Sequence, residues 1–180
     1  MVDTRRTRAR NDRPVNDGAV VYWMQRDQRV SDNWALLYAQ KKALERSVPL
    51  LVLFNLVPTF GKATLRQYDF MLKGLGEVEQ KLQTLNIPFI VVTGEPDVTI
   101  PEFVKRNRVG EVVVDFNPLR FVNQWRTNVA DALSIAFTEV DAHNIVPCWE
   151  ASHKQEFAAY TIRPKIQRKL TEFLTPFPAL

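Results

Sequence analysis

Short apolar runs alternate along the chain with longer segments in which apolar residues recur every three or four positions. The run from Ala19 to Met24 has the length of a buried strand, and a polar loop over residues 25–29 follows it. Ser31 or Asp32 can then cap a helix that begins near Trp34. This order predicts a strand, a charged loop and a helix, and in an open parallel sheet such a loop lies where ligands bind.

The same alternation continues through most of the chain. Four more strands are predicted by the apolar runs at residues 48–54, 87–93, 111–115 and 136–140. Amphipathic spacing predicts helices over residues 31–46, 66–85, 99–104 and 122–133. Five strands alternating with four helices predict an α/β fold, a doubly wound parallel sheet with helices on both faces. The link over residues 55–65 is unusually long, which is typical of a functional loop.

The composition fits one globular domain behind a basic N-terminal tail. The chain has 180 residues, of which 46% are hydrophobic, and a chain of this size buries roughly 70% of its unfolded surface. Five arginines and two aspartates lie in residues 1–13, giving this segment +3 of a net charge of +4. We therefore expect residues 1–18 to be a disordered basic tail. A solvated tail without a specific partner is favoured over one that binds nucleic acid. The α/β domain is expected over residues 19–150 and a helical extension over residues 151–180.

Several functional classes are disfavoured by simple counts. A single cysteine excludes an internal disulfide framework, and no apolar run approaches the ~18 residues of a membrane span. The N-terminus is not followed by a secretory apolar core, so we expect a cytoplasmic protein, or a nuclear one in a eukaryote, with no membrane partner. A phosphate-binding loop is absent, because Leu56 stands where a glycine would be required before Gly61-Lys62.

The residues that could carry catalysis or bind a metal have simpler interpretations. His143, Cys148 and His153 lack the paired short spacings of a zinc site, so we predict no metal; burial of Cys148 and a loop-fixing hydrogen bond from His143 are favoured. Among the strand-end aspartates, Asp115 and Asp141 are expected to cap the links that follow them. The tryptophans at positions 23, 34, 125 and 149 are expected in the core. We predict no catalytic residue in this chain.

Four segments resemble the photolyase and cryptochrome family, and most closely its class II cyclobutane-pyrimidine-dimer photolyases. The first contains Trp-x-x-Arg-Asp-x-Arg and Asp-Asn within residues 22–34, and the others follow in the family's order at residues 66–75, 115–120 and 141–152. The resemblance implies the amino-terminal domain of a light-driven repair enzyme, with the strand order 3-2-1-4-5. It also implies that the catalytic FAD is held by a helical carboxyl-terminal domain, whose linker we expect to begin near Leu180.

On this resemblance, the intact protein is expected to be a deoxyribodipyrimidine photo-lyase, whose partners are that helical domain and DNA with pyrimidine dimers. The 180-residue chain alone is then expected to be inactive. Three alternatives remain open. They are a cryptochrome-like photoreceptor domain, a stand-alone adenine-nucleotide-binding α/β domain, and a module that only docks its helical partner through an apolar face of residues 152–180.

The resemblance further implies an antenna chromophore, a deazaflavin or a folate, near the carboxyl ends of the strands. In the order 3-2-1-4-5 the topological switch point lies between the first and fourth strands, so the loops at residues 25–29 and 115–120 face one crevice. We therefore expect an antenna crevice lined by the residues at these strand ends. They are Met24, Arg26, Asp27, Phe54, Asn55, Asp115, Asn117 and Asp141.

Overall fold

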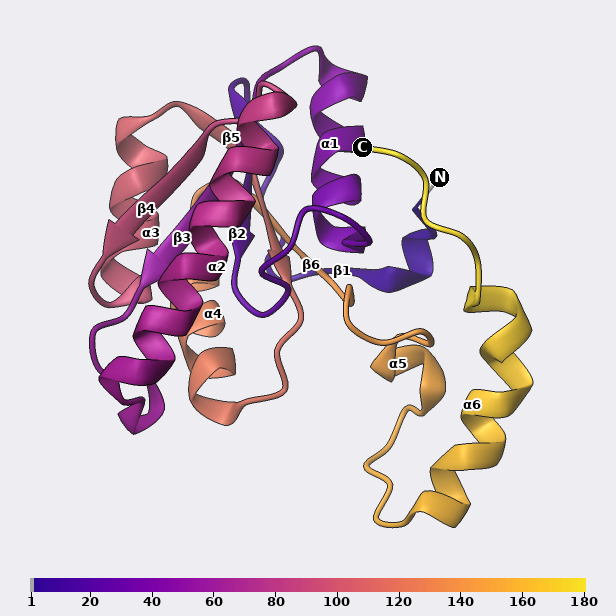
Figure 1. Ribbon diagram of the computed structural model, residues 1–180. Helices are drawn as coiled ribbons and strands as arrows, with labels where there is room; N and C mark the ends of the chain where they lie inside the picture. Colours follow the sequence, from indigo (N-terminus) through magenta and orange to yellow (C-terminus); the bar gives the residue numbers. More distant parts are fainter. Residues whose placement is uncertain (1) are drawn as a thin grey trace.

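A sheet of six strands runs through the protein, which a computed structural model describes over residues 2–180 (Figure 1). The strands are β1 (Thr7–Ala9), β2 (Ala19–Met24), β3 (Leu50–Leu56), β4 (Phe89–Thr93), β5 (Val109–Asp115) and β6 (Ala136–Val140). Their order is β1-β6-β5-β2-β3-β4, with β2 to β6 parallel and β1 antiparallel at one edge. The predicted doubly wound sheet and its order 3-2-1-4-5 are confirmed for the parallel strands. The predicted number of five strands is wrong by one, because β1 was not expected.

The N-terminal segment, residues 2–13, is built into the fold and is not the disordered tail that we expected. A 3₁₀ turn, η1 (Thr4–Arg6), precedes β1, and β1 pairs with β6 from Thr7 opposite Val140 to Ala9 opposite Thr138. Arg8 forms an ion pair with Glu139, which is fully buried on β6. The excess of arginine in this segment predicted disorder, because the local charge pattern does not include Glu139, the acidic partner of Arg8, which stands 131 residues later in the chain.

Helices cover both faces of the sheet. They are α1 (Trp34–Arg46), α2 (Leu65–Thr84), α3 (Pro96–Arg106), α4 (Arg120–Ala132), α5 (Cys148–Ala151) and α6 (Ala159–Phe173), with a 3₁₀ turn, η2 (Phe60–Lys62), before α2. The capping residue of α1 is Asn33 instead of Ser31 or Asp32, because its side chain accepts hydrogen bonds from the N–H groups of Ala35 and Leu36. A capping box between Thr64 and Gln67 opens α2.

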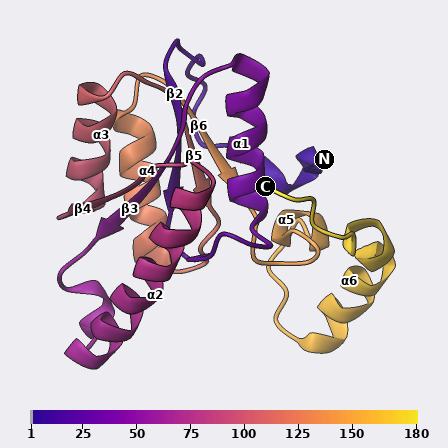
Figure 2. The same ribbon diagram turned by 45° about the horizontal axis from the view of Figure 1, so that its top comes forward.

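Successive residues of β2 point to opposite faces, and both faces are buried. Tyr22 and Met24 belong to the core beneath α1 and α2, whereas Val21 and Trp23 belong to the core beneath α3 and α4. Figure 2 shows α3 and α4 together on one side of the sheet and α1 on the other. The unbroken apolar run of β2 is explained by this double coverage, since a strand covered on both faces has no polar side.

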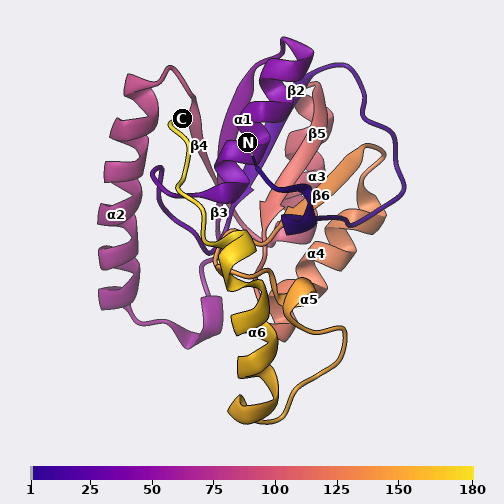
Figure 3. The same cartoon turned by 90° about the vertical axis from the view of Figure 1, so that its right-hand side faces the viewer.

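The short helix α5 and the long helix α6 pack on each other in a small separate cluster centred on Val146, Ala151 and Phe173. Figure 3 shows both helices beyond the end of the sheet, with the last residues of the chain running back toward α1. There the ring of Phe177 stacks on that of Trp34, with 4.2 Å between centroids. α6 continues through Pro164, although a proline inside a helix removes one backbone hydrogen bond. None of the helices in residues 2–180 is both long and apolar enough to cross a membrane.

Candidate functional site

A cavity of about 290 Å³ lies at the carboxyl ends of the parallel strands. Its floor is formed where β2 and β3 end, and α2 and α4 contribute opposite walls. The lining residues are Trp23, Met24, Gln25, Gln28, Phe54, Asn55, Leu56, Val57, Phe60, Ala63, Gln67, Tyr68, Met71, Pro96, Asn117, Val122 and Trp125. The cavity therefore occupies the edge of the sheet where ligands bind in open α/β folds.

The lining is aromatic and amide-rich, and none of the described residues that form it has a charged side chain. Phe60, Phe121 and Trp125 form a cluster at one wall, with ring centroids 5.3 Å apart for Phe60 and Phe121 and 6.1 Å apart for Phe60 and Trp125. Phe121 and Trp125 meet edge to face at 5.3 Å. Apolar walls with a few amide groups suit a flat, uncharged ring system better than a phosphate or a metal ion.

Four of the eight residues predicted for the crevice line this cavity. They are Met24, Phe54, Asn55 and Asn117. Each one lies within two residues of the end of a parallel strand, which is why their positions in sequence were sufficient to place them at the sheet edge. The other four predicted residues are not among those that line the cavity. They are Arg26, Asp27, Asp115 and Asp141.

Asp115 is fully buried beneath the loop that follows β2. Its carboxylate accepts hydrogen bonds from the backbone N–H groups of Gln25 at 2.7 Å, Arg26 at 2.6 Å and Asp27 at 3.0 Å. Burial raises the pKa of this carboxyl, and the three backbone donors act in the opposite direction. Asp115 thus shapes the loop from inside the protein, and Arg26 enters this network through its backbone.

Asp27 and Asp141 are also buried and hold loops together. The Oδ1 atom of Asp27 lies 3.2 Å from Nδ1 of His143, which is the kind of loop-fixing contact expected for that histidine. The carboxylate of Asp141 accepts from the N–H groups of Asn144 at 3.0 Å and Cys148 at 2.8 Å. Asp27 therefore fixes the loop after β2, and Asp141 fixes the loop after β6.

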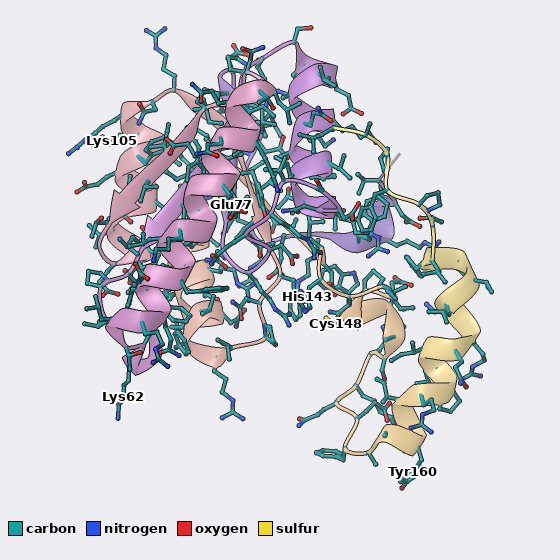
Figure 4. All side chains as sticks on the ribbon, in the orientation of Figure 1. Lys62, Glu77, Lys105, His143, Cys148 and Tyr160 are labelled. Atoms are coloured by element: carbon teal, nitrogen blue, oxygen red, sulfur yellow. The ribbon has the colours of Figure 1, made fainter. Side chains whose placement is uncertain are left out.

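Cys148 and the histidines do not form a reactive centre. Burial raises the pKa of the Cys148 thiol to about 11, and the nearby carboxylate of Asp141 acts in the same direction, so the thiol is neutral at physiological pH. Figure 4 shows His143 and Cys148 beside α5, and Lys62 extending outward from the segment before α2. No group of three or more His, Cys, Asp or Glu side chains suited to a metal ion occurs within residues 2–180.

Sequence reasoning missed the residues that enclose the cavity from the sides. Tyr68 and Met71 come from α2, Trp125 comes from α4, and Phe60 comes from the link before α2. The unusual length of that link was a signal for Phe60. No comparable signal existed for Trp125, because a tryptophan on the inward face of an amphipathic helix is expected in any core.

The fold and the cavity together define a doubly wound α/β domain with a ligand-sized site at the carboxyl edge of its sheet. The family model described as DNA photolyase matches residues 20–180. The chain belongs to the DNA photolyase family, of which it represents the amino-terminal α/β domain.

Curated relatives and solved structures agree with this membership. The deoxyribodipyrimidine photo-lyase of Potorous tridactylus is 54% identical over 162 residues, which cover 89% of this chain and 30% of that protein. The protein of the same name from Arabidopsis thaliana is 45% identical over 165 residues, covering 91% of this chain and 33% of the relative. The chain thus spans about a third of the length of these curated relatives.

Two solved structures share the fold at low sequence identity. A cryptochrome from Synechocystis sp. PCC6803 superposes with a TM-score of 0.71 at 16% identity, covering 85% of this chain and 34% of that one. An archaeal photolyase from Sulfolobus tokodaii, described as containing two FAD molecules with the implication of a novel light-harvesting cofactor, superposes with a TM-score of 0.69 at 17% identity. That match covers 83% of this chain and 35% of the archaeal protein.

Proposed function

We propose that this chain is the antenna-binding domain of a light-driven DNA repair enzyme, a class II deoxyribodipyrimidine photo-lyase that splits cyclobutane pyrimidine dimers. The uncharged, aromatic-walled cavity at the carboxyl edge of the sheet is the observation that carries the antenna assignment. The names of the similar curated proteins support the repair assignment. The segments at residues 22–34, 66–75, 115–120 and 141–152 support class II by their resemblance to that class.

The cavity favours a deazaflavin over a folate as the antenna. A cavity of about 290 Å³ is at the lower limit of common ligand sites, roughly 300 Å³, and so suits one fused ring system. A folate carries glutamate carboxylates, and within residues 2–180 no lysine or arginine lines this cavity to pair with them. The ring of a deazaflavin needs only aromatic walls and a few amide partners, which the lining provides.

In the intact enzyme, the chemical step is assigned to another part of the protein. We propose that FAD and the damaged DNA are held by a helical domain, and that excited reduced FAD donates the electron that splits the dimer. The role of this chain is to hold the antenna in a fixed orientation and to exclude water from it. Aromatic side chains that line the cavity, such as those of Phe60 and Trp125, serve both purposes.

The test is an action spectrum of dimer repair by the longest natural form of the protein, reconstituted with a deazaflavin or a folate. We expect the deazaflavin to add an absorption band that drives repair. Ala63→Trp should abolish this band while leaving repair through direct excitation of FAD, because Ala63 lines the cavity. Ala159→Trp, at an exposed position of α6, should leave both intact.

Each part of the proposal has a result that would overturn it. If neither chromophore binds, the antenna role is lost. If an antenna binds but pyrimidine dimers are not split under any wavelength absorbed by FAD or antenna, the repair assignment is lost and a chromophore-binding domain remains. If the enzyme repairs another photoproduct in place of cyclobutane dimers, the class II assignment is wrong.

A further inference from the structure

Most polar groups in the cavity wall are already engaged with the protein itself. The side-chain amide of Asn55 donates to the carbonyl oxygen of Gly94 at 2.7 Å, and its oxygen accepts from the hydroxyl of Thr99. The hydroxyl of Tyr68 donates to the carbonyl oxygen of Val57 at 2.5 Å. These groups hold the cavity's walls in place, so they are poor candidates for recognising a ligand.

Two other amides are engaged in the same way. The Oδ1 atom of Asn117 accepts from the backbone N–H of Leu119 at 3.1 Å. The Oε1 atom of Gln67 accepts from the backbone N–H of Thr64 at 2.7 Å as part of the capping box of α2. Their oxygens are therefore used to terminate a loop and to begin a helix.

Gln25 differs from these residues. Its backbone is fixed, because its N–H donates to Asp115 at 2.7 Å and its carbonyl oxygen accepts from the side chain of Gln28 at 3.1 Å. Its side chain lines the cavity, yet the Oε1 atom is shielded from water and has no hydrogen-bond donor among the described residues. A buried acceptor without a donor is unfavourable, and in a native protein it indicates a partner that completes it.

We propose that Gln25 is the specificity-determining residue of the cavity, and that its side-chain oxygen accepts a hydrogen bond from a ring N–H of the ligand. The fixed backbone holds the side chain at the cavity wall. Its Oε1 atom is shielded in the ligand-free protein, and a half-turn about the terminal two-fold torsion of the amide would bring this oxygen to the cavity and the bound ring. The absence of charge in the lining adds a second requirement. The site therefore selects an uncharged fused heterocycle with an imide N–H.

This inference rests on the proposed antenna function, and a pair of ligands tests it separately. The probes are a deazaflavin with a free N3–H and the same deazaflavin methylated at N3. Their affinities are measured by fluorescence for the longest natural form of the protein, for Gln25→Met, and for Gln80→Met on the exposed face of α2. Methionine keeps the length of glutamine but removes the acceptor.

The unmodified protein and Gln80→Met should bind the N–H ligand about 10-fold more tightly than the methylated one, since one hydrogen bond is at stake. Gln25→Met should lose this preference. If the preference persists in Gln25→Met, the methyl group is rejected by shape alone and the role of Gln25 is wrong. Equal binding of both ligands by the unmodified protein overturns it as well.

The melting temperature of the ligand-free protein distinguishes a structural role of Gln25 from a role in ligand binding. Gln25→Met should leave that temperature unchanged or raise it, because it removes an unpaired buried acceptor. A clear decrease would mean that Gln25 supports the fold, and would overturn the inference. If neither ligand binds the unmodified protein, the antenna proposal itself fails together with this refinement of it.

Discussion

The Nη2 atom of Arg6 lies 2.6 Å from the carbonyl oxygen of Ile145, and the guanidinium also donates to the carbonyl oxygens of Asn144 at 2.9 Å and Phe173 at 3.3 Å. Only 2% of this arginine is exposed. The guanidinium also faces the ring of Trp34, 4.9 Å from its centroid. One side chain of the N-terminal segment thus joins the loop after β6, the end of α6 and the start of α1.

Replacing Arg6 should therefore destabilise the whole chain. Arg6→Met removes the donors of several buried carbonyl oxygens, and we expect the free energy of unfolding to fall by about 3 kcal/mol. Urea denaturation measures the change. Arg13→Met is the matched control: Arg13 is exposed, and its substitution should stay within about 0.5 kcal/mol. Equal effects of the two substitutions would mean that the N-terminal segment acts only through its net charge.

The buried ion pair between Arg126 and Glu139 should show strong coupling. Both side chains are almost completely buried, and burial lowers the pKa of Arg126 while the charge of Glu139 opposes that shift. Glu139→Gln leaves a buried cation uncompensated and should cost about 3 kcal/mol. Adding Arg126→Met to the Glu139→Gln protein should cost much less stability than Arg126→Met costs in the unmodified protein. A double-mutant cycle measures this difference. Additive effects would show that the two charges do not depend on each other.

Asp115 should influence chromophore binding without touching the chromophore. Asp115→Ala leaves the N–H groups of Gln25, Arg26 and Asp27 without their acceptor, so we expect a loss of about 2 kcal/mol in stability. The loop beside the cavity should then lose its fixed geometry, and antenna affinity should fall about 10-fold. Asp12→Asn, at an exposed site, provides the control in both assays. If the Asp115→Ala protein is destabilised but keeps its antenna affinity, the geometry of this loop does not affect binding in the cavity.

The pKa of Cys148 predicts a specific loss of stability at alkaline pH. Burial raises this pKa from 9.0 to about 11, with the charge of Asp141 as the next cause. Because the folded state favours the neutral thiol, this contribution is fully present below pH 9 and is lost as the pH rises to about 11. Free energies of unfolding from pH 8 to 11.5 should fall more steeply for the unmodified chain than for Cys148→Ser. Parallel curves would contradict the raised pKa.

Local pattern determined the parallel part of the fold. The apolar run of β2 and the three-and-four spacing of α2 are properties of neighbouring residues, so they can be read directly from the sequence. The same reasoning placed Met24, Phe54, Asn55 and Asn117 at the edge of the sheet, because the end of a strand is also a local feature. Only the resemblance to photolyases supplied the strand order.

Tertiary structure decided what surrounds those strand ends. Trp125 and Tyr68 line the same cavity although they come from different helices, and Arg8 pairs with Glu139, which stands 131 residues later in the sequence. Asp115 was expected to line the antenna crevice, but its carboxylate points inward and accepts from three backbone N–H groups. No pattern of residues in the sequence predicts these three donors. Periodicity reports which face of an element is buried, whereas the partner that buries it is chosen by packing between elements far apart in the chain.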